Sequence, residues 1–423
     1  MLASKEYKDS GIVWLGHIPA HWDVTNYRRL FCRRKEYDDN PDKQVLSLTI
    51  EGVKRKNENF GKMAEDFTGH QIVRKDDLVF TPRDFDATPI LSGIAPCDGC
   101  ISNLYFVLYP RTPDIDVNFY NYFMWGVKWG GDIWKKLSYG MRFSYNYDQF
   151  CALPAIKIPF KEQKAIADYL DKECAKIDSL VEKQRSIIEK LKEYKKSVIT
   201  EAVTRGLDPA APMKDSGIEW IGKIPAHWEI RRIKTLGEYR NGLTYNPENM
   251  VGEEGTLVLR SSNVQNGKLV FEDNVFVNSE IPDQLFVRKG DIIICSRNGS
   301  RELVGKNAVV KEDLHASFGA FMMVFRSRYP EYMSYILNSA IFNYYLSSFF
   351  TSTINQLTGS NFGNMRIVFC PDKKEQDEII EYLDHKCEAI DEVIEKREKL
   401  IGLLIEYKKS LIYECVTGKK GVA

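Results

Sequence analysis

Two long segments of the chain carry apolar residues at alternating spacings of four and three, a pattern that predicts helices pairing through a heptad seam. The segments cover residues 162–204 and 375–417, and neither contains an internal proline. At 1.5 Å per residue each helix would be roughly 65 Å long. The predicted seam positions are Leu170, Ile177, Leu180, Gln184, Ile187, Leu191 and Tyr194 in the first helix, and Leu383, Ile390, Val393, Arg397, Leu400, Leu404 and Tyr407 in the second.

A helix of this length cannot bury an apolar stripe against itself, so the simplest partner for each helix is the other. The first helix leads from one globular region to the next and the second leads back, which predicts an antiparallel pair. The two globular regions would then lie at opposite ends of the pair, with the first residues of the chain near the end of the second helix. The alternative is that the helices pair with those of a second copy of the chain.

The sequence repeats itself in two further ways. Residues 8–22 read KDSGIVWLGHIPAHW and residues 214–228 read KDSGIEWIGKIPAHW, identical at twelve of fifteen positions and 206 residues apart. The helical segments also align with each other, 213 residues apart. We interpret the tryptophans and prolines of the short motif as a packing strip, and His21 and His227 as part of that strip rather than ligands.

This order of elements predicts a duplicated chain of class α+β. Two globular domains of α/β type would be separated by two long antiparallel coiled-coil helices, with a pseudo-twofold axis relating the halves. The predicted boundaries are 1–159 for the first domain with its motif, 160–206 for the first helix, 207–213 for a linker rich in Gly, Pro and Ala, 214–371 for the second domain with its motif, and 372–423 for the second helix and tail.

Each globular domain contains short apolar runs that predict strands and one aromatic-rich stretch that predicts a helix. The strand-like runs are 45–50, 77–80 and 101–109 in the first domain, and 256–259, 291–295 and 320–325 in the second. The helix-like stretches are 117–134 and 331–350. Aromatic residues in such stretches more often belong to a core than to a stacking surface.

Composition narrows the classes of protein. No apolar run approaches the roughly 20 residues of a membrane span, and the first residues lack a secretory signal, so we expect a cytoplasmic protein without membrane contact. The nine cysteines are mostly scattered, and Cys97 and Cys100 lack the second pair that a zinc site requires, so no metal is expected. The 59 basic and 59 acidic residues weigh against nucleic-acid binding unless the basic groups gather on one face.

The sequence contains no catalytic motif: there is no G-x-x-x-x-G-K-[ST] phosphate loop, no H-E-x-x-H and no G-x-S-x-G. Polar loops follow several predicted strands instead. Arg and Asn can contact guanine and adenine edges, and Ser in a turn suits phosphate, although each loop taken alone could equally be an ordinary surface turn. The candidate DNA-binding residues are Arg83, Asp84, Arg142, Ser144, Asn146, Arg260, Ser262, Asn263, Arg297, Asn298, Arg301, Ser360 and Asn361.

The whole pattern resembles the specificity subunits of Type I restriction-modification systems. The resemblance covers nearly the entire chain. It rests on the D-S-G-I-x-W-x-G-x-I-P-x-H-W motif at 9–22 and 215–228 and on the Glu-Gln helix starts at 162–163 and 375–376. The helix endings SVITEAVT at 197–204 and SLIYECVT at 410–417 complete it.

The resemblance implies a non-catalytic DNA-recognition subunit. Each globular domain would be a target recognition domain reading one half of a bipartite sequence in double-stranded DNA, and the helices would set the gap and dock two methyltransferase subunits. Those partners would use S-adenosylmethionine to methylate adenine. Two restriction subunits, when present, would add ATP- and Mg²⁺-dependent translocation and cleavage, and this chain would hold no cofactor.

Another interpretation remains open. The zero net charge favours a coiled-coil assembly scaffold with two ligand-binding domains that do not bind DNA.

Overall fold

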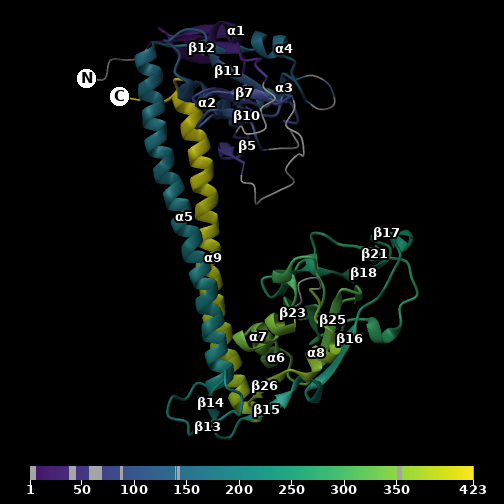
Figure 1. Ribbon diagram of the computed structural model, residues 1–423. Coiled ribbons are helices and arrows are strands. Elements are labelled where there is room, and N and C mark those ends of the chain that lie inside the picture. The colour runs from purple at the N-terminus through teal and green to yellow at the C-terminus, as the bar shows by residue number, and fades with distance from the viewer. Residues whose placement is uncertain are drawn as a thin grey trace. The chain divides into compact units, whose positions relative to one another are not determined.

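The computed structural model describes residues 6–37, 44–56, 69–85, 89–138, 140, 143–349 and 355–422. The chain forms two compact units (Figure 1). The first unit is Met1–Arg185 with Glu398–Ala423, and the second is Ser186–Arg397. Each unit therefore combines one globular region with parts of both long helices. Within the described residues, no helix is long and apolar enough to cross a membrane.

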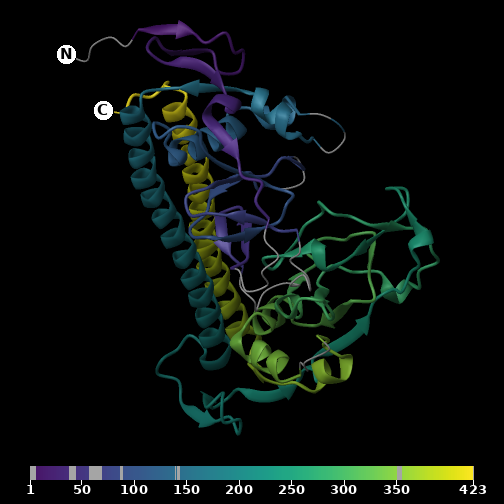
Figure 2. The ribbon, with the colours of Figure 1, turned by 45° about the horizontal axis from the view of Figure 1, so that its top comes forward.

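The two long helices are α5 (Phe160–Arg205) and α9 (Lys373–Val416), and they lie side by side (Figures 1 and 2). In the first unit, the Lys408 ammonium of α9 contacts both carboxylate oxygens of Asp178 in α5 at 2.7 Å. In the second unit, Lys195 of α5 contacts both oxygens of Asp391 in α9 at 2.7 Å. The two pairs involve positions 213 residues apart in the sequence, so one contact is the repeat of the other.

The predicted seam is wrong at five of its fourteen positions, which are exposed. Leu170, Ile177, Leu383 and Ile390 are buried as predicted, and Gln184, Leu191, Arg397 and Leu404 are half-buried. Leu180 and Tyr194, however, are 45% and 55% exposed, and the equivalent Val393, Leu400 and Tyr407 of α9 are also exposed. Ile187 is half-buried, and its neighbour Ile188 is fully buried.

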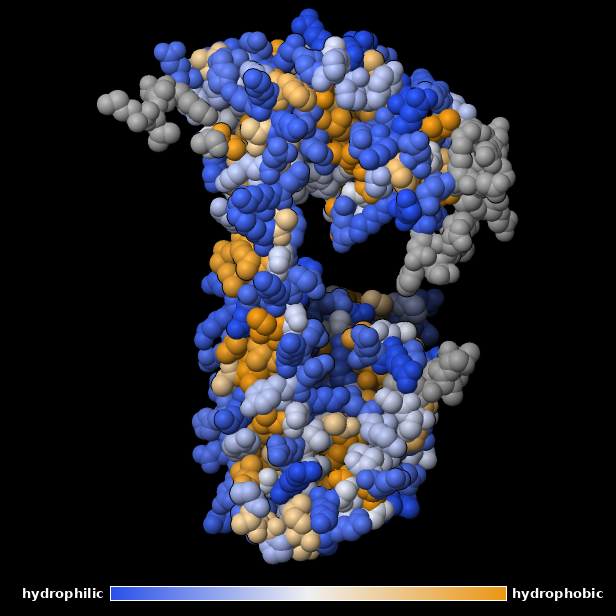
Figure 3. All heavy atoms as spheres, turned by 60° about the vertical axis from the view of Figure 1, so that its left-hand side comes forward, coloured by the Kyte–Doolittle hydropathy of each residue, from blue (hydrophilic) through white to orange (hydrophobic). Residues whose placement is uncertain are grey.

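The buried stripe of each helix instead passes one residue later in each heptad. In α5 it uses Cys174, Val181, Ile188 and Lys195, and in α9 it uses Cys387, Ile394, Ile401 and Lys408. Adjacent apolar residues, such as Leu180 with Val181 and Leu400 with Ile401, allow the heptad spacing to be assigned at either position. Packing keeps Leu170, Ile177, Leu383 and Ile390 in the stripe and moves its other positions by one residue, so that the lysine stem is half-buried and its ammonium reaches an aspartate. Exposed apolar side chains consequently lie among charged ones along the helices (Figure 3).

Each unit contains a four-stranded antiparallel sheet with the same strand order. In the first unit the order is β4 (Phe31–Arg33), β11 (Phe106–Pro110), β8 (Leu78–Phe80) and β9 (Ser92–Ile94). In the second it is β16 (Gly237–Asn241), β25 (Met322–Ser327), β22 (Ile292–Cys295) and β23 (Asn307–Val309). The predicted mixture of helices and strands is therefore confirmed.

The other elements of the first unit surround its sheet. They are β1 (Tyr7–Asp9), β2 (His17–Pro19), β3 (Asp23–Asn26), α1 (Tyr27–Leu30), β5 (Leu46–Thr49), β6 (Gly52–Arg55), β7 (Gln71–Val73), β10 (Gly99–Ile101), α2 (Val117–Trp129), α3 (Ile133–Lys136), α4 (Tyr147–Ala152) and β12 (Pro154–Lys157).

The second unit repeats much of this arrangement and adds small strands. Its elements are β13 (Met213–Asp215), β14 (Lys223–Pro225), β15 (Glu229–Arg232), β17 (Met250–Val251), β18 (Thr256–Leu259), β19 (Val264–Gln265), β20 (Lys268–Leu269), β21 (Phe276–Val277), β24 (Ala316–Phe318), α6 (Pro330–Leu337), α7 (Ala340–Phe349), α8 (Gly359–Asn364) and β26 (Arg366–Phe369).

Three predicted elements are each divided in two. The run 101–109 contains the end of β10 and most of β11, because a turn at 102–105 separates two strands that belong to different sheets. The stretch 117–134 breaks at Gly130 and Gly131, where Gly131 has a φ of +145° that a side chain would oppose. The stretch 331–350 breaks at Asn338 and Ser339, whose side chains bond backbone carbonyls of α6.

The repeated tryptophan motif packs against the start of the long helix that follows its own domain. Trp22 is buried and its indole N–H donates to Glu162 at 2.6 Å, while His21 lies 2.7 Å from the other oxygen of that carboxylate. Trp228 and His227 contact the equivalent Glu375, at 3.0 and 2.7 Å, but both reach the same carboxylate oxygen, Oε2. The packing role predicted for the motif is confirmed, and its acidic partner was not foreseen.

The N-terminal motif also meets the end of α9, as the sequence predicted. The Tyr7 hydroxyl donates to the carbonyl of Gly418 at 3.1 Å, and the Tyr413 hydroxyl donates to the carbonyl of Trp14 at 3.4 Å. Gly418 has a φ of +75°, and a Cβ at this position would lie 2.4 Å from Pro19. A glycine is therefore required where the helix ends against the motif.

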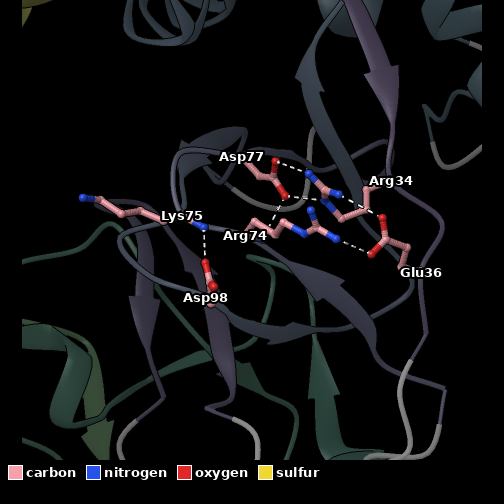
Figure 4. A network of polar contacts seen from close by, with 6 residues as sticks. All are labelled: Arg34, Glu36, Arg74, Lys75, Asp77 and Asp98. Atoms are coloured by element: carbon pink, nitrogen blue, oxygen red, sulfur yellow. Dashed lines mark hydrogen bonds and ion pairs between the residues drawn. The ribbon is translucent and has the colours of Figure 1, made fainter.

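An arginine clamp fixes the turn before the central strand of each sheet. In the first unit Arg34 donates two hydrogen bonds to Asp77, at 2.7 and 3.1 Å, and a third to Glu36, which also accepts from Arg74 (Figure 4). Asp77 additionally accepts from the backbone N–H of Arg74 at 2.8 Å. In the second unit Asp291 accepts two bonds from Arg326 and one from the backbone of Arg288.

Candidate nucleic-acid interface

The loops that leave β8 and β22 occupy equivalent places in the two units. Asp77 and Asp291 directly precede the two strands, and Arg83 and Arg297 each follow that aspartate by six residues. The backbone N–H of Tyr145 donates to the Pro82 carbonyl at 2.8 Å, and that of Leu357 donates to the Ser296 carbonyl at 2.7 Å. Each exit loop is thus hydrogen-bonded to the segment before a short helix, α4 in the first unit and α8 in the second, which lies 63 and 61 residues further along the chain.

In the second unit, the structure brings two of the predicted polar loops together with the segment at Asn355. The Asn298 side-chain amide donates to the Ser261 hydroxyl at 3.1 Å, which joins the loop after β22 to the loop after β18. The backbone N–H of Asn298 donates to the Asn355 carbonyl at 3.4 Å, and the Asn355 amide donates to the Gly299 carbonyl at 3.2 Å. The result is one polar surface, the 261–298–355 surface, built from segments that are remote in sequence.

Several predicted contacts in this region have structural roles instead. Asn263 is fully buried, and its amide bonds the Val270 carbonyl and Asn274, so the prediction that it contacts DNA is wrong. An amide that closes a turn this way cannot reach a base edge. The side-chain oxygen of Asn298 accepts from the backbone N–H of Ser300 in its own loop, and its amide nitrogen donates to Ser261 in the loop after β18.

The candidate arginines of the second unit differ in their burial and in their hydrogen-bond partners. Arg260 is half-buried and donates to Asp273 at 2.9 Å. Arg301 is exposed and donates to the carbonyl of Ser347 at 3.2 Å. Arg297 is exposed and lies with its guanidinium 5.2 Å from the centre of the Phe321 ring. Ser262 is half-buried in the turn beside Arg260.

The late loop of the second unit is organised by a helix cap. The Thr358 hydroxyl accepts from the backbone N–H of Asn361 at 3.1 Å at the start of α8. Ser360 is exposed and Asn361 half-buried in this first turn. Both therefore stay available at the surface, next to the segment that holds the loop after β22.

In the first unit the equivalent loop is anchored by aromatic packing. Phe85 is buried against Phe80, Trp134 and Tyr145, so the residues before it are held at the end of β8. Arg83 and Asp84 are half-buried, and Asp84 has a φ of +59°, the left-handed conformation that aspartate tolerates.

The second predicted loop of the first unit carries a helix cap. The Asn146 side chain accepts from the backbone N–H of Gln149 at 2.9 Å, and the Gln149 side chain accepts from the backbone N–H of Asn146 at 2.8 Å. These two bonds form a capping box at the start of α4. Asn146 thus stabilises the helix that orients this loop. Ser144 is half-buried beside it, and Arg142 lies outside the described residues.

Two residues of this surface were missed by the sequence interpretation. Phe321 lies inside the predicted strand 320–325, but in the structure it precedes β25 and is 58% exposed. Asn355 lies outside every predicted polar loop. The signal for Phe321 was an aromatic residue directly after Gly319-Ala320, where a turn is favoured. Within the parts of the chain that the structure describes, no group of three His, Cys, Asp or Glu side chains could hold a metal ion.

The chain is similar to known proteins of one kind. Residues 225–401 match the family model described as the Type I restriction modification DNA specificity domain. The StySPI specificity subunit of Salmonella potsdam is 27% identical over 205 residues, and the EcoKI specificity subunit of Escherichia coli (strain K12) is 29% identical over 210 residues. Each match spans 47% of this chain and 44% of the relative, so less than half of either curated protein is compared.

A solved structure has a similar fold along nearly the whole chain. It is described as showing the structural basis of complex assembly and conformational transition of the type I R-M system. The TM-score is 0.67 at 14% identity, over 95% of this chain and 99% of that one. Residues 225–401 are therefore similar to the DNA specificity domain of Type I restriction-modification systems, and the fold of nearly the whole chain is similar to that of a solved structure from such a system.

Proposed function

We propose that the chain is the DNA sequence-specificity subunit of a Type I restriction-modification complex and catalyses no reaction itself. The observation that carries the proposal is the pair of equivalent exit loops. Equivalent sheets, equivalent arginine clamps and equivalent backbone hydrogen bonds hold Arg83-Asp84 in the first unit and Arg297-Asn298 in the second. Two loops held in the same way but carrying different polar side chains are suited to bind two different DNA half-sites.

In this proposal the long helices are a spacer. The repeated ion pairs Lys195–Asp391 and Lys408–Asp178 support an antiparallel coiled coil with a pseudo-twofold axis. Such a spacer would hold the two target recognition domains apart, so that each meets one half of a bipartite site. Half-sites on one face of double-stranded DNA lie about 34–36 Å apart or at a multiple of that distance.

The chemistry would belong to partner subunits. Two methyltransferase subunits would dock on the helices and supply S-adenosylmethionine for adenine methylation. Two restriction subunits would bring ATP and Mg²⁺ in a complex that cleaves DNA. Leu180 and Leu400 are among the exposed apolar side chains on the helices. Burying this apolar surface against a methyltransferase subunit would favour docking.

A footprint tests the proposal. The full chain assembled with its methyltransferase subunits should protect two short DNA segments separated by an unprotected gap, and its affinity should fall steeply with salt. Inserting seven residues into both helices together should lengthen the gap and leave both half-sites unchanged. One continuous footprint, or binding that ignores sequence, would contradict the proposal and favour a scaffold for other ligands.

A further inference from the structure

The contact between Arg297 and Phe321 is fixed by the backbone as well as by the side chains. The backbone N–H groups of Ser296 and Arg297 both donate to the Phe321 carbonyl, at 2.9 and 3.1 Å. On the other side, Arg297 forms a β-bridge with Gln356. With its main chain held at both edges, the arginine side chain extends across the exposed aromatic ring, and the guanidinium stands 5.2 Å from the ring centre.

The polar edge of this guanidinium stays available. Among the described residues, the Arg297 side chain makes no hydrogen bond or ion pair, whereas Arg260 bonds Asp273 and Arg301 bonds the Ser347 carbonyl. Stacking over a ring occupies only the face of the guanidinium, so its N–H donors can still point outward. The ring thus orders the side chain without using its donors.

We propose that Arg297 reads a guanine in one half-site, with Phe321 as its positioning residue. Guanine presents two acceptors, O6 and N7, to the major groove, and their spacing fits two parallel N–H donors of a guanidinium. Lysine is a point charge and lacks this fork. An arginine already ordered by the Phe321 ring would lose less conformational freedom on binding than a free one. The inference rests on the proposed function and adds to it the identity of one base.

The first unit provides a contrast at the same position. In the β22–β25 ladder Ile292 pairs with Phe325, and in the β8–β11 ladder Leu78 pairs with Leu108. The residue four places earlier is Phe321 in the second unit and Leu104 in the first. Leucine has no π face for a guanidinium, so Arg83 lacks an aromatic partner at the position that Phe321 occupies beside Arg297. Asp84 also takes the place of Asn298 beside Arg83.

Selection from a randomised duplex library tests the assignment. The probe is a pool of duplexes with a randomised central segment, bound by the full chain with its methyltransferase subunits and sequenced after selection. The variants are Arg297→Ala, Arg297→Lys and Phe321→Leu. Lys311→Ala is the matched control, because it removes an exposed positive charge from the same unit without touching the 261–298–355 surface.

Wild type and Lys311→Ala should select the same two-part motif. Arg297→Ala and Arg297→Lys should lose about 10- to 100-fold of the preference for guanine at one position of one half-site, with the other half-site unchanged. Phe321→Leu should weaken the same preference about two- to fivefold. Because Arg297→Lys keeps the charge, its salt dependence of binding should equal that of wild type.

The outcomes separate the two levels of the argument. If wild type selects no two-part motif, the proposed function fails and the guanine assignment fails with it. If wild type selects such a motif and Arg297→Lys retains every base preference, only the guanine assignment is overturned. If Arg297→Ala loses both half-sites through misfolding, Arg297→Lys decides, since lysine preserves the stem and the charge. A preference for another base at the affected position also overturns it.

Discussion

Replacing Asp77 by alanine should destabilise the first unit more than the equivalent Asp291→Ala destabilises the second. In the wild-type chain Asp77 accepts two bonds from Arg34 and one from the backbone of Arg74. The Arg34 and Asp77 side chains are only 9% and 4% exposed. Removing the carboxylate leaves a buried guanidinium without its main partner, which costs about 3–5 kcal/mol in comparable buried pairs.

The second unit should lose less stability because its arginine can regain water. Asp291 is as deeply buried as Asp77, but the Arg326 side chain is 29% exposed. Once the carboxylate is gone, Arg326 can be solvated, so we expect a loss of about 2–3 kcal/mol, below the range for a fully buried ion. The difference between the two variants follows from the exposure of the two guanidinium groups.

Chemical denaturation followed by circular dichroism measures both losses, and binding to half-site duplexes shows which unit is affected. Asp148→Ala is the control, because the Arg28–Asp148 pair is largely exposed and should contribute less than about 1 kcal/mol. Equal losses in Asp77→Ala and Asp291→Ala, or a loss in Asp77→Ala no larger than in the control, would refute the reasoning.

Three further outcomes follow from the fold. Burial raises the pKa of Glu375, but hydrogen bonds from His227, Cys370 and Trp228 outweigh it and hold that pKa below its ordinary value. The carboxylate therefore adds stability at pH values above its unfolded pKa, and this contribution is lost as the pH falls through the folded pKa. Glu375→Gln should flatten the pH dependence of Tm below about pH 5. An unchanged slope would contradict this. Leu170→Ala should lower the free energy of unfolding by about 2–5 kcal/mol because Leu170 is buried, whereas the exposed Leu180→Ala should change it by no more than about 0.5 kcal/mol. Urea denaturation measures both values. Similar losses in the two variants would show that Leu180 is part of the buried seam after all. Gly418→Ala should lower Tm, because its φ of +75° and its contact with Pro19 leave no room for a methyl group, whereas Gly402→Ala, within α9 and in open space, should raise Tm slightly.

The candidate site was predictable only in part. The sequence singled out Arg297 because an arginine after an apolar run stands at the exit of a strand, and the structure places it there. It could not distinguish Arg297 from Asn263, which is equally polar and also follows a strand but is buried. Hydrophilic residue type indicates what a side chain can bond. Whether those hydrogen bonds are already made inside the protein depends on neighbours that the fold brings close, as it brings Asn274 to Asn263.

The sequence by itself determined the long helices and the duplication, because both are recorded in local and repeated patterns. Helix length follows from residues that all favour helix without an internal proline, and identical motifs imply identical local contacts, such as Trp22 with Glu162 and Trp228 with Glu375. Tertiary structure alone decided which apolar stripe is buried. Neighbouring positions of the heptad can each face a partner, and the choice between them depends on the partner helix, where Asp178 and Asp391 accept from Lys408 and Lys195.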